Sequence, residues 1–288
     1  PSRMAEVLNR VIEKAFRGSA PAQINVPRDY WTQVIDIELP PIVRFERQGG
    51  GKEAIENAAK LLSKAKFPVI LSGAGVVLGG AIDECKKLAE KLDAPVCNGY
   101  QHNDSFPGSH PLAVGPLGYN GSKAAMELIS KADVVLALGT RLNPFSTLPG
   151  YGIDYWPKKA TIIQVDMNPD RIGLTKKVSV GICGDAKQVA QQILDKLSSD
   201  AGNTGREERK NLIHKTKSAW LQTLSGLDHE EDDPGTVWNK EARERDKDRM
   251  SPRQAWRAIQ DALPQDAIIS SDIGNNCAIG NAYPTFEK

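Results

Sequence analysis

The stretch Pro68-Val69-Ile70-Leu71-Ser72, followed at once by Gly73-Ala74-Gly75, decides the fold class of this chain. A short apolar run that ends at a glycine turn is typical of a strand buried on both faces of a parallel sheet. The same pattern returns at Asp133–Leu138 and Thr161–Val165. Shorter strands are predicted over Pro95–Asn98 and Val178–Val180, and helices over Glu53–Ala65, Ala81–Leu92, Ser122–Lys131 and Ala186–Leu197. Because apolar strands alternate with amphipathic helices, residues 52–197 are predicted to form one α/β domain around a parallel, Rossmann-like sheet.

The chain on either side of this domain resembles pieces of other domains. Ser2–Phe16 has apolar residues at helical spacing, and Ala22–Val26 is predicted as a strand. One helix and one strand cannot enclose a core, so we expect them to end an earlier domain. Beyond the sheet, Ser251-Pro252 is typical of a helix start and predicts a helix over Arg253–Leu263. A short apolar run at Ala267–Ser270 is predicted as a strand.

Two polar stretches separate these parts. Residues 38–51 contain two prolines and the run Gly49-Gly50-Gly51, which is the composition of a linker. Residues 198–250 are strongly polar, and Trp220, Leu221 and Leu224 predict a single docked helix within an otherwise solvated connection. The predicted parts are therefore residues 1–40, 41–200, 201–250 and 251–288.

Composition and charge exclude several classes of function. Of the 288 residues, 40% are hydrophobic and 25% are charged, as in globular proteins, and the net charge is +1. This charge gives no electrostatic reason to expect nucleic acid or an anionic membrane as a partner. The four cysteines, Cys85, Cys97, Cys183 and Cys277, are far apart and form no Cys-x-x-Cys pair. We therefore expect buried thiols in a reducing, cytoplasmic compartment, and neither a zinc site nor disulfides.

Two groups of residues at the predicted carboxyl edge of the sheet are candidates for nucleotide contacts. Gly73 and Gly75 follow a strand and precede a helix, where backbone N–H groups can approach an anion. Their spacing departs from the NAD fingerprint, so a tight turn without ligand is an equal alternative. Arg141, Asp166 and Asp185 also follow strands, where they can contact a phosphate or ribose. For the two aspartates, helix capping remains the alternative.

One histidine and one turn are the remaining candidates. His102, in the loop Gly99–Asp104, is a possible proton carrier, although a single loop histidine is usually just exposed. The turn Asp272-Ile273-Gly274-Asn275-Asn276 offers backbone N–H groups and two side-chain amides, which suit a phosphate or diphosphate. Ordinary chain reversal is the alternative for this turn. The spacing of these residue types in the sequence predicts neither a Ser-His-Asp triad nor a Cys-His pair for nucleophilic catalysis.

The residues Ser271-Asp272-Ile273-Gly274-Asn275-Asn276-Cys277-Ala278 resemble the opening of the diphosphate-binding domain in thiamine diphosphate enzymes of the acetolactate synthase group. Ala20–Asp29 resembles the end of that family's pyrimidine-binding domain. Further segments are similar to the central, DHS-type domain: Gly73–Ala81, Phe106-Pro107, His110-Pro111-Leu112, Gly118, Gly139-Thr140-Arg141, Gln164-Val165-Asp166 and Gly184-Asp185-Ala186. The resemblance implies that residues 1–40 end the first domain and residues 41–200 are the complete central domain. It implies that residues 201–250 connect this domain to the start of the third domain at 251–288.

The resemblance implies thiamine diphosphate and Mg2+ as cofactors, held between two subunits of a homo-oligomer, either a dimer or a tetramer. It assigns Gly274, Asn275 and Asn276 to the cofactor diphosphate. A catalytic Glu and the magnesium ligands are expected outside these 288 residues, so no metal ligand is predicted here. We expect the chain to be inactive by itself.

The sequences of the loop Asn98–Asp104 and the tail Asn275–Tyr283 are most similar to those of sulfonate-cleaving acyltransferases of this group. That similarity implies sulfoacetaldehyde and phosphate as substrates, and acetyl phosphate and sulfite as products. Flavin-binding relatives carry Gly-Met-His where this chain has Gly118-Tyr119-Asn120, and an acidic pair where it has Asn143-Pro144. We therefore expect no FAD.

Two other hypotheses about the function remain open. One is another enzyme of the same group, such as an acetolactate synthase or a glyoxylate carboligase. The other is a nucleotide-binding module without catalysis. A Gly-Asp-Gly motif with a paired Asn downstream of Lys288 would favour an enzyme over the module.

Overall fold

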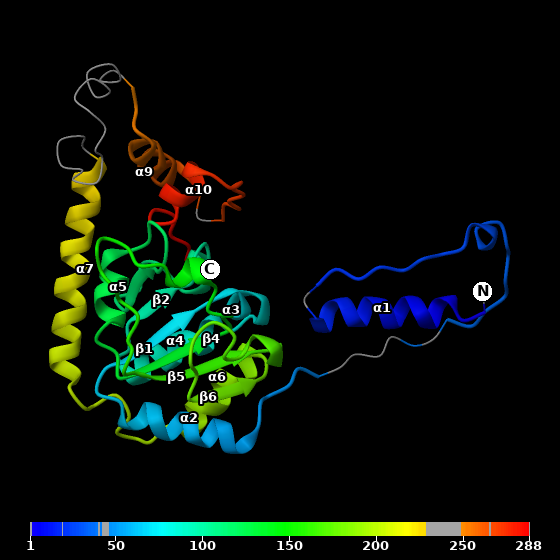
Figure 1. Cartoon of the computed structure of the whole chain (residues 1–288), viewed down its shortest axis with the longest axis horizontal. Helices are drawn as coiled ribbons and strands as arrows, with labels where there is room; N and C mark the ends of the chain where they lie inside the picture. Colours follow the sequence, from blue (N-terminus) through cyan, green and yellow to red (C-terminus); the bar gives the residue numbers. More distant parts are fainter. Residues whose placement is uncertain are drawn as a thin grey trace. The chain divides into compact units, whose positions relative to one another are not determined.

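The computed structural model describes residues 2–18, 20–39, 41, 46–228, 249–264 and 266–287 (Figure 1). The chain divides into two compact units, Pro1–Arg47 and Gln48–Lys288. The middle of the predicted polar connection, residues 229–248, lies outside the described residues.

The first unit is formed by helix α1 (Met4–Gly18) and a short 3-10 helix at Arg28–Tyr30. Helix α1 contains no buried residue, and Val7, Leu8 and Ile12 on its apolar face are 39–45% exposed. The strand predicted at Ala22–Val26 is wrong, because this segment pairs with no other strand in the described part of the chain. A strand is stable only beside a partner that satisfies its backbone polar groups.

The second unit is built around a six-stranded parallel sheet, as predicted, with the strand order β3-β2-β1-β4-β5-β6. The strands are β1 (Pro68–Ser72), β2 (Val96–Asn98), β3 (Ala113–Pro116), β4 (Val134–Leu138), β5 (Thr161–Asp166) and β6 (Val180–Cys183). Every residue of β1 and β4 is buried, which explains their continuous apolar sequences. The order of the strands reverses between β1 and β4, so their carboxyl ends flank the point where open α/β sheets bind ligands.

Five helices in the described part of the chain accompany this sheet: α2 (Lys52–Lys64), α3 (Ala74–Gly79), α4 (Ile82–Leu92), α5 (Lys123–Ile129) and α6 (Ala186–Lys196). Their contacts define two groups. Helices α2 and α4 both pack against α6, whereas α5 packs against β2, β3 and the long helix α7 (Arg206–Asp228), which runs beside it in Figure 1. All four helices predicted around the sheet are confirmed within a few residues.

Two strand predictions in this domain need correction. The last strand is Val180–Cys183, two residues later than the predicted Val178–Val180. Strand β3 was not predicted, because Gly115 and Pro116 interrupt its short apolar run.

Helix α7 confirms the docked helix predicted from Trp220 and Leu224, but it begins well before them, at Arg206. Its buried stripe is Arg209, Ile213, Thr216, Trp220 and Leu224, all at most 8% exposed and spaced three or four residues apart. Leu221, predicted to dock with them, is 53% exposed. The prediction of a solvated connection is wrong for the part of this helix that precedes Trp220.

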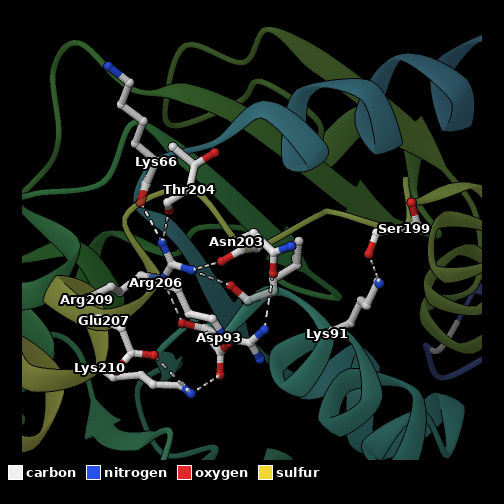
Figure 2. Close-up of polar contacts among 12 residues, drawn as sticks. Lys66, Lys91, Asp93, Ser199, Asn203, Thr204, Arg206, Glu207, Arg209 and Lys210 are labelled. Carbon is white, nitrogen blue, oxygen red and sulfur yellow. Dashed lines mark hydrogen bonds and ion pairs between the residues drawn. The ribbon is translucent and has the colours of Figure 1, made fainter.

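Arg209 fixes the beginning of α7 to the sheet domain (Figure 2). Arg209 is 1% exposed, and its guanidinium group donates to five main-chain carbonyl oxygens. The acceptors are those of Lys66 (2.6 Å), Leu92 (2.9 Å), Asp93 (2.9 Å), Gly202 (2.5 Å) and Thr204 (2.8 Å). Arg206 pairs with the Asp93 carboxylate beside this cluster, so the end of α4 and the start of α7 are joined.

The second unit ends in helices α9 (Pro252–Ala262) and α10 (Asn275–Gly280). Ser251 and Gln254 form a capping box at the start of α9, which confirms the predicted helix start. The strand predicted at Ala267–Ser270 is wrong, because these residues join no sheet within the described ranges.

Candidate functional site

The switch point between β1 and β4 is closed by backbone contact. The Gly75 N–H donates to the Gly139 carbonyl at 2.8 Å, and the Gly73 N–H donates to Leu138 at 3.1 Å. A Cβ atom on Gly75 would lie 2.7 Å from Gly139 Cα, so only glycine fits there. Both N–H groups predicted to face an anion are therefore already bonded, and close packing accounts for the two glycines.

Asp166 and Asp185 both bind backbone N–H groups that follow their strands. Asp166 is 8% exposed and its Oδ1 accepts from the Asn168 N–H at 2.8 Å. Asp185 is 1% exposed and caps α6, accepting from the N–H groups of Lys187 and Gln188. The capping alternative is confirmed for Asp185 and is wrong for Asp166, because Asn168 is the N-cap of the 3-10 helix at Pro169–Arg171. The assignment of both aspartates to a nucleotide stays a prediction.

His102 lies in the loop that follows β2, at the carboxyl edge of the sheet. It precedes a 3-10 helix at Asn103–Ser105, and its N–H donates to the Gly99 carbonyl at 2.9 Å. Burial lowers the pKa of His102; Asp104 opposes this shift, and Arg141 adds to it. The loop after β2 and the loop after β4 therefore bring His102, Asp104 and Arg141 within electrostatic reach of one another. Asp104 Oδ1 is shielded from solvent and has no hydrogen-bond partner among the described residues.

The turn predicted to hold a diphosphate lies at the start of α10. Gly274 has a φ of +141°, and a Cβ atom there would meet nothing within 4 Å. Asn275 and Asn276 are exposed in the first turn of the helix, where backbone N–H groups lack intrahelical partners. The Trp256 Nε1–H donates to the Asn276 carbonyl at 2.9 Å, which ties the turn to α9.

Two asparagines for which the sequence predicted no role connect the tail, which begins with α10, to the sheet domain. Asn281, 4% exposed, bonds the loop residues Gln101, Leu117 and Tyr119. Asn103 donates to the carbonyls of Asn281 and Pro284. The tail thus packs onto the loop that carries His102. An asparagine in a loop gives no signal of such a contact, because its partners are 160 or more residues away in the sequence.

In the part of the chain that the structure describes, no group of three or more His, Cys, Asp or Glu side chains can hold a metal ion. No helix among those residues is long and apolar enough to span a membrane. Three of the four cysteines are buried as predicted, whereas Cys183 is half-buried. Burial raises the pKa of Cys85 to about 12, so this thiol is protonated at neutral pH.

The family model for the central domain of thiamine pyrophosphate enzymes matches residues 55–193. Over all 288 residues the chain is 78% identical to a probable sulfoacetaldehyde acetyltransferase from Rhizobium meliloti, covering 49% of that protein. It is 76% identical to a sulfoacetaldehyde acetyltransferase from Roseovarius nubinhibens, covering 48% of it. The chain thus spans about half the length of the curated relatives it matches.

A solved structure shares the fold. The crystal structure of benzoylformate decarboxylase from Polynucleobacter necessarius aligns with 100% of this chain and 48% of its own, with a TM-score of 0.70 and 17% sequence identity. Together with the parallel six-stranded sheet, these matches lead to one conclusion. The chain belongs to the thiamine pyrophosphate enzyme family, and residues 55–193 are the central domain of that family.

Proposed function

We propose that the protein containing this chain is a thiamine diphosphate-dependent acyltransferase that converts sulfoacetaldehyde and phosphate to acetyl phosphate and sulfite. The observation that carries the proposal is the 78% identity over all 288 residues with a relative named for this acetyltransferase activity. The identity includes both the central domain and the tail with the Gly274–Asn276 turn. No observation favours acetolactate synthesis, glyoxylate carboligation or a non-catalytic module in its place.

The donor groups of the tail fit the diphosphate of this cofactor. The space beside Gly274 is open, and the exposed Asn275 and Asn276 add neutral amide donors to the N–H groups of the first turn of α10. Neutral donors suit an anion that Mg2+ already partly neutralises. Asn275 and Asn276 would therefore bind and orient the diphosphate.

The cofactor, when bound, supplies a nucleophilic carbon and an electron sink for cleaving the carbon–sulfur bond. This chain's contribution is to hold the diphosphate and to bring the His102 loop close to the tail. His102, neutral near pH 7 because burial lowers its pKa, can accept or donate a proton. We propose that the activating Glu and the magnesium ligands come from other parts of a homo-oligomeric protein, and that FAD is not part of the site.

A direct assay of the full-length protein tests the function. We expect sulfite and acetyl phosphate to form from sulfoacetaldehyde and phosphate only when thiamine diphosphate and Mg2+ are present. The matched reaction supplies pyruvate alone. Acetolactate formation from pyruvate, without sulfite release from sulfoacetaldehyde, would show that the protein is a synthase instead.

The diphosphate contact is tested by the substitution Asn276→Asp in the full-length protein. A carboxylate beside the diphosphate removes a donor and adds repulsion, so we expect the dissociation constant for thiamine diphosphate to rise at least tenfold, or about 1.4 kcal/mol. Calorimetric titration measures this constant. Asn276 is exposed in the first turn of α10, where a negative charge is favourable, so the melting temperature should not fall. Unchanged affinity would place the diphosphate elsewhere.

A further inference from the structure

Asn281 uses every polar atom of its side chain to join the end of α10 to the sheet domain. Its Oδ1 accepts from the Gln101 N–H at 3.0 Å. Its Nδ2 donates to the carbonyl oxygens of Leu117 at 3.5 Å and Tyr119 at 3.3 Å. At 4% exposure, this amide is bonded on both sides out of contact with water. A buried amide that is fully satisfied fixes the relative position of the segments it joins.

Asn103 makes the reverse contact, from the sheet domain to the tail. Its Nδ2 donates to the Asn281 carbonyl at 3.0 Å and to the Pro284 carbonyl at 2.7 Å. The two asparagines therefore form a reciprocal pair, which we call the amide clamp. One belongs to the tail and binds the loop backbone, and the other belongs to the loop and binds the tail backbone.

The clamp lies at the opposite end of α10 from the proposed diphosphate contacts. Helix α10 has only six residues, so about 9 Å of helix separates its first turn from Asn281. The preceding residues Ala267–Ser270 form no strand that would fix the turn from the other side. Besides the clamp, further contacts hold the turn. Trp256 of α9 bonds the Asn276 carbonyl, and the Cys277 thiol contacts Tyr100 and Gln101 of the loop.

We propose that Asn281 and Asn103 are positioning residues that set where the Gly274–Asn276 turn lies relative to the His102 loop. The inference rests on the proposed function, in which this turn holds the diphosphate of thiamine diphosphate. Neither residue contacts the cofactor. Both act through α10, which connects them rigidly to Asn275 and Asn276.

The substitutions Asn281→Asp and Asn103→Asp in the full-length protein test the clamp from its two sides. Each replaces an amide donor with a carboxylate oxygen that faces two carbonyl oxygens. We expect the dissociation constant for thiamine diphosphate, measured by calorimetric titration, to rise at least fivefold in each variant. At saturating cofactor, kcat should return to within twofold of the wild-type value, because the reacting groups are unchanged.

Asn203→Asp is the matched control, because the exposed Asn203 only accepts a bond from Arg206 and Asp preserves that acceptor. A wild-type protein that binds no thiamine diphosphate would overturn the proposed function itself. Wild-type binding together with unchanged dissociation constants in both variants would overturn the clamp alone. If Asn281→Asp does not fold, the result for Asn103→Asp decides, because Asn103 lies in a half-buried loop.

Discussion

His102 shows how its surroundings set the charge of a single residue at the carboxyl edge of the sheet. Burial lowers the pKa of this imidazole from its ordinary value near 6.5, and Arg141 lowers it further, while Asp104 raises it. The unfolded chain therefore binds a proton at a higher pH than the folded protein. The stability that depends on neutral His102 is complete above about pH 6.5 and decreases as the pH falls from there toward the folded-state pKa.

Substitution of the two charged neighbours should shift this titration in opposite directions. Arg141→Gln removes a positive charge and should raise the pKa of His102, whereas Asp104→Asn removes a negative charge and should lower it further. Imidazole 15N chemical shifts followed by NMR between pH 4 and 8 measure both changes. Shifts of the same sign in the two variants would contradict the electrostatic contact.

At the scale of elements, the contact between the β1 and β4 turns depends on Gly75. Gly75→Ala would place a methyl group 2.7 Å from Gly139 Cα, and backbone atoms on both sides cannot move away. Alanine favours a helix over glycine by about 1 kcal/mol, but overpacking costs up to about 3 kcal/mol. We expect a net loss of about 2 kcal/mol in the free energy of unfolding, measured with urea.

Gly51→Ala is the control for this substitution. A Cβ atom on Gly51 meets nothing within 4 Å, and its φ of −81° suits any residue. Gly51 is the N-cap of α2, and Ala is a poorer N-cap residue than Gly, so we expect a loss of about 1 kcal/mol, smaller than for Gly75→Ala. Equal losses in the two variants would mean that close approach to Gly139 does not constrain Gly75.

The sequence predicted those elements whose burial follows a simple period. Strands β1, β4 and β5 are mostly apolar because both faces of the sheet are covered, and this pattern is visible in the sequence. The docked helix predicted at Trp220 and Leu224 is confirmed, but the first half of α7 was not predicted, because its buried stripe contains Arg209 and Thr216, which a hydrophobic pattern does not count. The predicted strands at Ala22–Val26 and Ala267–Ser270 have suitable composition, but a strand also needs a neighbour, which local sequence does not report.

The candidate site was predicted less completely than the fold. Candidates adjacent to strands, such as Asp185 and His102, follow from the rule that ligands bind at the carboxyl edge of a parallel sheet. The clamp residues Asn103 and Asn281 were not assigned, because their contacts join segments far apart in the chain. Hydrogen bonds between a side chain and distant backbone leave no periodic trace in a sequence.

At the scale of the whole molecule, the two compact units predict independent stability. Residues 1–47 make up one unit, and its helix α1 contains no buried residue. Deletion of residues 1–47 keeps Gln48 and Gly49, whose carbonyls accept from the Asp185 N–H and the Gln192 amide at 2.8 Å each. We expect the melting temperature of the sheet domain to change by less than about 2 °C, or under about 1 kcal/mol.

Deletion of residues 1–50 provides the comparison, because it also removes both of these acceptors. Scanning calorimetry should show a clear decrease in the melting temperature for this longer deletion only. A large decrease already in the shorter deletion would mean that the first unit stabilises the sheet.

The Arg209 cluster has a consequence for how the protein tolerates sequence change. All five acceptors are main-chain carbonyls, which every amino acid supplies, so the side chains at the acceptor positions carry no information for this contact. Lys66 and Thr204 have exposed side chains and should accept most substitutions in a saturation library scored for folded protein. Position 209 should accept only arginine, because lysine has one charged nitrogen in place of a planar fork and leaves buried carbonyls unbonded, at a cost of about 3 kcal/mol. One arginine side chain thus fixes the start of α7 to three separate segments of backbone, and the two exposed acceptor positions can vary without loss of this contact.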